Sequence, residues 1–131
     1  IKPGQVTDRD AMSMDLFPTV AEAAGTSVDH EIEGVSFYPF IMGKNQPETE
    51  RDLFWGRTEG GKYAGGAIHA VRRGDWKLIQ NMPGAPFELY NLRKDPQENK
   101  NLINQEKAIA KELKHAFQLQ RAKYTRYPWR K

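Results

Sequence analysis

The sequence predicts an α+β fold in which a small four-stranded antiparallel sheet is packed by a long C-terminal helix and preceded by a helix and loops. Two observations predict it. Strand-like segments separated by turn residues occupy residues 53–91, and beyond them Ile109, Leu113 and Phe117 recur every four residues with Lys and Gln between them. The first pattern is typical of hairpins, and the second of an amphipathic helix that lays one apolar stripe on a sheet.

A first helix is predicted over about residues 13–24. Ser13 is a candidate N-cap; alternatively, Pro18 marks the first turn, where its missing N–H costs nothing. Gly25 stands where a C-terminal cap belongs. One helical face carries three apolar residues at a spacing of four: Leu16, Val20 and Ala24. After an acidic loop, residues 34–43 (GVSFYPFIMG) are expected to form a turn and a short helical or irregular apolar anchor.

The sheet is predicted from four strands, at residues 53–57, 67–72, 76–80 and 87–91. Between the first two strands, the glycine-rich segment TEGGKYAGG is expected to be a mobile loop. Between the second and third, Gly74 tolerates a positive φ and therefore suits a tight hairpin. These turn residues predict antiparallel connections throughout the sheet.

The segment DPQE, residues 95–98, has the form of a capping box at a helix start. In that interpretation Asp95 accepts from a backbone N–H, Pro96 occupies the first helical position and Glu98 reaches back to the cap. The helix that follows is predicted over about residues 102–122 and ends in a basic tail.

Composition and charge narrow the function classes. The 131 residues suffice for a buried core, and they contain no cysteine, which excludes disulfides, thiol nucleophiles and Cys-bound zinc within the chain. No apolar run approaches the roughly 18 residues of a membrane span. Residues 107–131 carry eight Lys or Arg against one acidic residue, a net +7, whereas residues 1–106 carry twelve against sixteen, a net −4. Because the chain begins with isoleucine and without a signal-like segment, it is expected to be cut from a longer protein.

Five dispersed segments together resemble the C-terminal portion of the sulfatases, the sulfuric ester hydrolases of the alkaline-phosphatase superfamily. KPGQVTD and MDLFPTVAEAAG look like the family's segment that ends in an Asp-x-x-Pro-Thr helix and a glycine. EGVSFYPFIMG resembles its Gly-x-Ser-x-x-Pro-x-x-x-Gly segment, and AVRRGDWKLI its Arg-x-Gly-Asp-Trp/Tyr-Lys hairpin. ELYNLRKDPQENKNL is similar to its Leu-Tyr-Asp/Asn-Leu, Asp-Pro-x-Glu-x-x-Asn-Leu signature. The similarity covers about residues 2–117 in the expected order.

The resemblance also implies a division of the chain. Residues 1–50 would be the end of the larger sulfatase α/β domain, and residues 51–131 the C-terminal subdomain, built from the sheet, the long helix and the basic tail. The residues expected to maintain the subdomain structurally are those of the hairpin and signature motifs: Gly74, Asp75, Trp76, Lys77, Tyr90, Asp95, Pro96 and Glu98.

The resemblance implies cofactors that this chain does not supply. Sulfatases carry a formylglycine made from the first residue of a Cys/Ser-x-Pro-Ser-Arg motif, and a calcium ion held by carboxylates and an amide, both in the N-terminal domain. No such motif occurs in this sequence. We therefore expect no catalytic residue and no metal site in the chain, no hydrolysis of sulfate esters by the chain alone, and an N-terminal catalytic domain as its partner.

The expected role is a wall on one side of the cleft that receives a sulfated aryl or sugar substrate. Loops facing such a cleft hold a sugar by hydrogen bonds and ring stacking. The candidate substrate-binding residues are Trp55, Arg57, Glu59, Lys62, Tyr63, His69 and Asn81. Each also has a simpler interpretation: Trp55 as core, Arg57 with Glu59 as an exposed ion pair, and His69 as a hydrogen-bonded sheet residue.

Two alternatives belong to other function classes. The tail AKYTRYPWRK interleaves cations with aromatic rings, which suits a polyanion or nucleic-acid binding module, although nucleic acid is the less expected partner. An independent interaction module would have a closed surface, whereas a subdomain of a larger enzyme would expose an apolar patch. The residues expected in that patch are Leu16, Phe17, Phe37, Phe40 and Ile41. The family favours an exported enzyme, periplasmic or extracellular, and no membrane contact.

Overall fold

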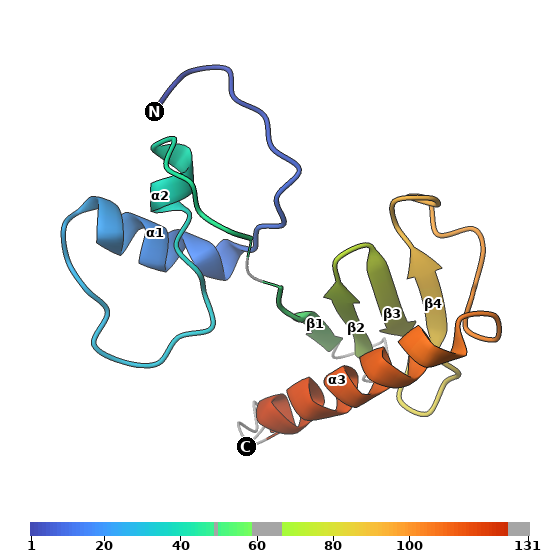
Figure 1. The fold of residues 1–131 in the computed structure, drawn as a ribbon. Helices are drawn as coiled ribbons and strands as arrows, with labels where there is room; N and C mark the ends of the chain where they lie inside the picture. The colour runs from blue at the N-terminus through green and yellow to red at the C-terminus, as the bar shows by residue number, and fades with distance from the viewer. Residues whose placement is uncertain (49, 59–66, 126–131) are drawn as a thin grey trace. The chain divides into compact units, whose positions relative to one another are not determined.

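The computed structural model of the protein describes residues 1–48, 50–58 and 67–125 (Figure 1). The chain forms two compact units, residues 1–49 and 50–131, and each is described by itself. The first is helical in its described part, and the second combines four antiparallel strands with one long helix. The predicted α+β class is therefore confirmed. Within the described ranges, no helix combines the length and apolar character that crossing a bilayer requires.

The first predicted helix is present as a 3-10 turn, η1 (Ser13–Asp15), continuous with α1 (Leu16–Ala23). Pro18 is buried in its first turn, as one of the two start signals predicted. At the other end Gly25 has φ 72°, and the Thr26 and Gly25 amides donate to the carbonyls of Ala21 and Glu22, each at 3.0 Å. That pair of bonds is the glycine cap expected at this position.

A buried carboxylate joins this helix to the apolar anchor around α2 (Tyr38–Ile41). Asp15 is only 1% exposed, and its two oxygens accept from the backbone amides of Met12 at 2.7 Å and Val35 at 2.8 Å. Thr19 Oγ1 accepts from the Phe37 amide at 2.9 Å. Gly34 lies so close that a Cβ there would stand 2.2 Å from the Met14 carbonyl oxygen. Asp15, Thr19 and Gly34 thus hold the two N-terminal motifs against each other.

The second unit is built on a sheet of strand order β1-β2-β3-β4, with every neighbouring pair antiparallel. Its strands follow the predicted segments within one residue at each end: β1 (Leu53–Thr58), β2 (Ala67–Arg73), β3 (Trp76–Gln80) and β4 (Glu88–Asn91). Gly74 has φ 53° in the two-residue turn between β2 and β3. A side chain there would be strained, which explains glycine at this turn.

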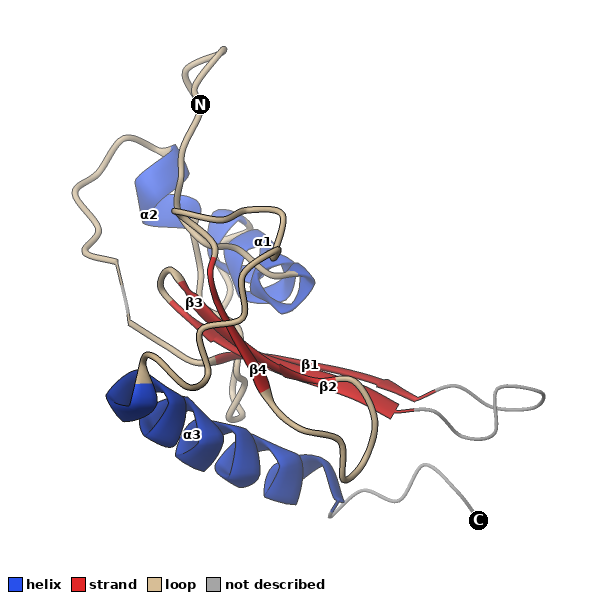
Figure 2. Ribbon diagram, turned by 90° about the vertical axis from the view of Figure 1, so that its right-hand side faces the viewer, coloured by secondary structure: helices blue, strands red, loops and turns tan. Residues whose placement is uncertain are grey.

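Helix α3 (Lys107–Thr125) covers one face of the sheet (Figure 2). The core lies between them and consists of inward residues from each strand and from the helix stripe: Phe54, Val71, Leu78, Leu89, Ala110, Leu113, Ala116 and Phe117. Each fully buried large side chain contributes about 1.5–3 kcal/mol relative to its exposed state. The helix is therefore held by burial of its predicted stripe.

The capping-box interpretation of residues 95–98 is wrong, and α3 begins at Lys107 rather than near residue 102. Asp95 accepts instead from the Lys100 amide at 2.8 Å, and Glu98 has φ 57°, which interrupts any right-handed helix. The chain then runs along the outer edge of β4, where the Leu102 amide donates to the Leu89 carbonyl at 2.7 Å. Pairing with the sheet edge thus takes the place of the first predicted helical turn.

Candidate functional site

The sheet presents two chemically different faces. Alternation along a strand sends neighbouring side chains to opposite sides, so residues beside the inward Phe54 and Val71 point away from α3. On that second face Trp55 is 42% exposed and Ile68 is 37% exposed. Arg57 belongs to the same face of β1 and is also exposed. Trp55 is therefore a surface ring, and its interpretation as a core residue is wrong.

His69 lies on the face that α3 covers. Its ring stacks on Phe54 with centroids 5.8 Å apart and meets the Phe117 ring edge-on at 6.1 Å. Burial lowers the pKa of His69, and the nearby charge of Arg121 lowers it further. Gly56 stands opposite on β1, where a Cβ would come within 3.2 Å of the His69 ring. The missing side chain of Gly56 makes room for the histidine.

A row of polar contacts crosses β3 and β4 on the face away from α3. Lys77 Nζ donates to both Glu98 oxygens, at 2.7 and 2.8 Å. The Tyr90 hydroxyl donates to Glu88 Oε2, and Asn81 Nδ2 donates to Glu88 Oε1 at 2.9 Å. The hydrogen bond to Glu88, with burial, raises the pKa of Tyr90 to about 12. The hairpin motif and the Asp-Pro-x-Glu signature are thus linked by one ion pair.

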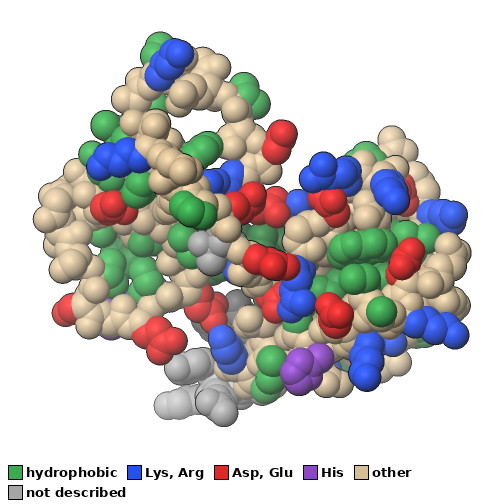
Figure 3. All heavy atoms as spheres, in the orientation of Figure 1, with side chains coloured by type: hydrophobic (Ala, Val, Ile, Leu, Met, Phe, Trp, Pro, Cys, Tyr) green, Lys and Arg blue, Asp and Glu red, His purple; other side chains and the backbone are tan. Residues whose placement is uncertain are grey.

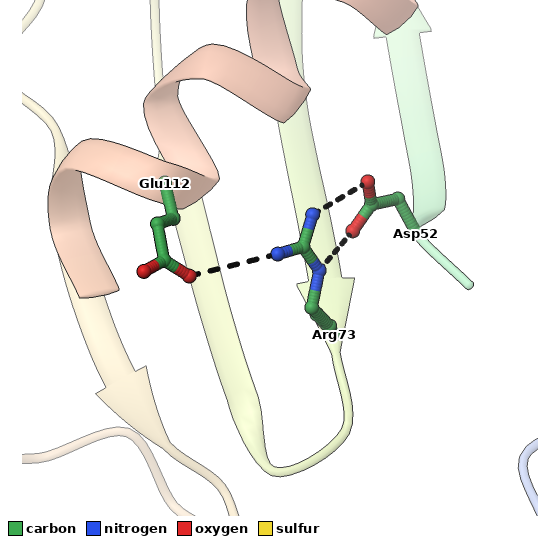
Figure 4. Close-up of polar contacts among 3 residues, drawn as sticks. All are labelled: Asp52, Arg73 and Glu112. Carbon is green, nitrogen blue, oxygen red and sulfur yellow. Dashed lines mark hydrogen bonds and ion pairs between the residues drawn. The ribbon is translucent and has the colours of Figure 1, made fainter. Parts of the chain in front are cut away.

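Arg73 fastens β2 to two other elements (Figure 4). Its guanidinium donates from Nε and Nη2 to the two Asp52 oxygens, at 2.7 and 2.9 Å, and its Nη1 lies 3.7 Å from Glu112 of α3. The ion pair with Asp52 raises the pKa of Arg73. Asp75, at the other end of the Arg-Gly-Asp turn, pairs with Arg93 at 2.8 Å. Both charged ends of this tripeptide are therefore engaged within the fold.

The structure separates the predicted substrate-binding residues into three groups. Trp55 and Arg57 share the open face of β1, whereas His69 packs under α3 on the opposite face. Asn81 is exposed and oriented by Glu88. The other three candidates, Glu59, Lys62 and Tyr63, lie outside the described residues. Substrate contact by any of the seven stays a prediction.

The residues predicted to be structural lie in turns, ion pairs and packing contacts, and their structural role stays a prediction. Tyr90 is 8% exposed and Trp76 packs against the core. Gly74, Asp75, Lys77 and Glu98 act through the turn and the ion pairs above. Asp95 accepts from the backbone amides of Lys100 and Asn99, which lowers its pKa, and Pro96 is exposed in the same turn.

Sequence reasoning missed three carboxylates that order the fold: Asp15, Asp52 and Glu112. For Asp15 a signal existed, because an acid three residues before Pro18 in the first helical turn favours backbone amide contacts. For Asp52 and Glu112 no local signal exists, since their partner Arg73 is 21 and 39 residues away. Across the described ranges, no three His, Cys, Asp or Glu side chains gather into a group that could hold a metal ion.

This chemistry suits positioning and binding. The described residues offer ring surface, amides and cations on a rigid sheet, with their carboxylates largely used in internal contacts. The fold and the linked motifs define the C-terminal part of a sulfatase-type hydrolase, and a family comparison makes this specific. The chain belongs to the family described as N-sulphoglucosamine sulphohydrolase, C-terminal, whose model matches residues 1–123.

Similar proteins agree with this assignment. The chain is 29% identical over 123 residues to an N-acetylglucosamine-6-O-sulfatase of Bacteroides thetaiotaomicron, covering 91% of the chain and 22% of that protein. It is 30% identical over 95 residues to a Delta 4,5-hexuronate-2-O-sulfatase of the same organism, covering 72% and 20%. A solved structure of a 2-O GAG sulfatase matches with TM-score 0.67 and 29% identity, covering 86% and 24%. The chain spans about a fifth of the length of these curated relatives, and none of them supports the alternative of a nucleic-acid binding module.

Proposed function

We propose that this chain is the C-terminal part of a sulfuric ester hydrolase that acts on sulfated glycans. The observation that carries the proposal is the family match over residues 1–123 together with relatives about five times as long. Two of those relatives are named for sulfate groups on amino sugars and uronates, which favours a sulfated sugar over a simple aryl ester as the substrate.

The proposed role of the chain is to supply one wall of the substrate cleft. Trp55 supports this, because an exposed ring on a rigid strand offers a sugar a stacking surface at little entropic cost. Arg57 follows it on the same face, and a guanidinium binds sulfate oxygens through paired N–H donors. Glu59, Lys62 and Tyr63 follow directly in the sequence and complete the proposed contact set.

The proposed partner is an N-terminal catalytic domain of the same polypeptide. On α1, Leu16, Phe17 and Val20 are 66%, 57% and 64% exposed, an apolar surface that a larger domain would cover. Of the other patch candidates, Phe37, Phe40 and Ile41 are half-buried, with the Arg9 guanidinium 4.2 Å from the Phe40 ring centroid. Docking would therefore involve α1 more than α2.

The formylglycine nucleophile and the calcium ion are proposed to belong to that N-terminal domain. The described residues of this chain do not fit a calcium site, since no cluster of carboxylates comes together among them. No step of the reaction is assigned to this chain beyond binding and orienting the substrate. An exported location is proposed on the family's behaviour alone.

Assays of sulfate release test both parts of the proposal, the assignment of the parent as a sulfatase and the role of this chain as a wall of the cleft. The parent polypeptide should release sulfate from N-acetylglucosamine 6-sulfate or a 2-O-sulfated unsaturated disaccharide, and the 131-residue chain should release none. In the parent, Trp55→Ala and Arg57→Ala should raise KM about tenfold each with kcat less affected, equivalent to about 1.4 kcal/mol of binding. The matched control Arg93→Ala lies on the surface of the same unit and should leave KM unchanged. Release by the 131-residue chain alone would refute the assignment, and unchanged KM in both β1 variants would refute the wall.

A further inference from the structure

One flank of α3 carries a stripe of four cations and one glutamine. About 100° of rotation per residue places five polar side chains within an arc of about 80°: Lys107, Lys111, Lys114, Gln118 and Arg121. At about 1.5 Å per residue the stripe is about 21 Å long, the length of a short oligosaccharide. Figure 3 shows cationic side chains on the face of the second unit that carries α3.

The charge of the stripe is largely uncompensated by neighbouring acids of the helix. Between residues 107 and 121 Glu112 is the one acidic residue in the sequence, and it faces Arg73 at 3.7 Å. Lys107, Lys111 and Arg121 are exposed, and Lys114 is half-buried. Cations held on a rigid helix with their like charges together raise the local concentration of a polyanion.

Beside the stripe lies an open depression with the chemistry of a sugar subsite. It is lined by the end of the β3–β4 loop, the turn before α3 and Lys114. Lys114 Nζ lies 5.4 Å from the centre of the Phe87 ring. Asn101 Oδ1 accepts from the Leu89 and Ile103 amides, at 3.1 and 3.0 Å, which fixes the amide oxygen and leaves the Nδ2 group as a donor for another partner.

Glu88 also lines the depression, but its carboxylate points to the sheet face away from α3. Glu88 accepts from Asn81 and from Tyr90, so its hydrogen-bonding capacity is directed into the fold. Its remaining charge disfavours an anion at that end of the depression. The sulfate of a ligand is therefore expected near Lys114 and Lys111, with an uncharged part of the sugar toward Asn101 and Asn104.

We propose that the α3 stripe and the adjoining depression form a binding surface for a sulfated polysaccharide chain. The proposal rests on the proposed function for its choice of polyanion, because the sulfate-bearing substrate class is taken from there. The observations independent of that function are the stripe and the depression with its ring and fixed amide. A duplex nucleic acid needs the cations alone, whereas a sulfated sugar also uses the depression.

Binding of the 131-residue chain to chondroitin sulfate, to unsulfated chondroitin and to duplex DNA tests the proposal. The triple variant Lys107→Gln, Lys111→Gln, Lys114→Gln removes three stripe cations. The matched control, Lys2→Gln, Lys44→Gln, Lys94→Gln, removes three exposed cations elsewhere with the same change in net charge. Affinities are measured by titration calorimetry at several salt concentrations, with circular dichroism confirming that each variant is folded.

The chain should bind the sulfated polymer at least tenfold more tightly than the unsulfated one, which keeps only its uronate carboxylates. The stripe variant should bind the sulfated polymer at least tenfold more weakly. The slope of log K against log salt concentration should become shallower by about two to three, because about one counterion is released per cation contact. The control should stay within about twofold of the parent sequence, since charges off the stripe make no contact. Asn104→Ala should weaken binding without changing the slope.

Several results would overturn the proposal. Equal losses in the stripe variant and the control would make the binding a net-charge effect. Equal affinity for DNA, or an unaffected Asn104→Ala, would remove the sugar subsite. Failure of this proposal can be told apart from failure of the proposed function, because sulfate release is measured on the parent polypeptide. If the parent releases sulfate but the chain binds no polymer, only the stripe proposal is rejected. If the chain binds polymer but the parent releases no sulfate, the proposed sulfatase function is rejected.

Discussion

Replacing Arg73 with Ala should destabilise the second unit by about 2 kcal/mol. The guanidinium makes two hydrogen bonds to Asp52, and bonds to charged groups contribute about 1.5–3 kcal/mol each when buried. The Arg73 and Asp52 side chains are 33% and 21% exposed, so the pair lies between a buried one, worth about 3–5 kcal/mol on breaking, and a surface one at about 0–1 kcal/mol. Glu112, at 3.7 Å and 61% exposed, adds little.

The measurement is urea unfolding of the 131-residue chain followed by circular dichroism. Asp52→Ala and the double variant complete a cycle, in which the Arg73–Asp52 coupling should be about 1–2 kcal/mol. Arg73→Lys should recover less than half of the loss, because a lysine cannot reproduce two parallel N–H donors. Glu112→Ala should cost about 0.5 kcal/mol or less.

The matched control is Arg93→Ala. Arg93 also pairs with an aspartate through Nε at 2.8 Å, but its side chain is 79% exposed, so its removal should cost about 0.5 kcal/mol or less. If Arg73→Ala and Arg93→Ala cost the same, or if the Arg73–Asp52 coupling is zero, the argument that partial burial gives this pair its strength is refuted.

Three further predictions concern other contacts. Asp15→Ala leaves two part-buried backbone amides without their acceptor and should cost about 2–5 kcal/mol in thermal or urea unfolding, whereas Asp8→Ala, at an exposed position before the helix, should cost far less. Gly34→Ala should be poorly tolerated, because its Cβ would stand 2.2 Å from a backbone oxygen; a soluble variant with an unchanged melting temperature would contradict this. Tyr90 has a folded pKa of about 12 against an ordinary 10, so its contribution of about 2–3 kcal/mol is complete below pH 10 and is lost as the pH rises toward 12. Unfolding at pH 9 and pH 11.5 should show this loss in the natural sequence and not in Tyr90→Phe; parallel losses would argue against it.

The local sequence pattern was sufficient to predict the strands, two turn or cap glycines and the apolar stripe of α3. Gly, Pro, Asn or Asp stands within two residues of every strand end, so the ends could be predicted within one residue. Gly74 and Gly25 were predictable because each must take a positive φ at a turn or helix end. The stripe of α3 was predictable from its spacing of four, which matches the helical period.

Some features depend on tertiary contacts and therefore could not be predicted from the local sequence. The start of α3 depends on the pairing of Leu102 with Leu89 and on the positive φ of Glu98, and no local rule favours that conformation for a glutamate. The position of His69 was accessible in principle: alternation from the apolar Val71 places it inward, away from the Trp55 face. The structure confirms this placement, because His69 packs against Phe54 and Phe117 on the face that α3 covers.

The contacts explain why the family motifs occur together. The Asp-x-x-Pro-Thr helix meets the Gly-x-Ser segment through Asp15 and Gly34, and the hairpin meets the Asp-Pro-x-Glu signature through Lys77 and Glu98. A substitution in one motif therefore removes the partner of another, and such coupled residues can change only at a cost in stability.

Residues that recognise a substrate face the opposite requirement, since they must differ between enzymes that cleave different esters. Trp55 and Arg57 on β1, and Lys107, Lys111 and Lys114 on α3, lie outside every linked pair of motifs. Substituting them should therefore alter binding far more than folding, while substituting Asp15 or Arg73 should do the reverse. Comparing the change in unfolding free energy with the change in ligand affinity for both sets in the same chain separates the two roles; equal effects on both quantities would show that scaffold and recognition surface are not independent.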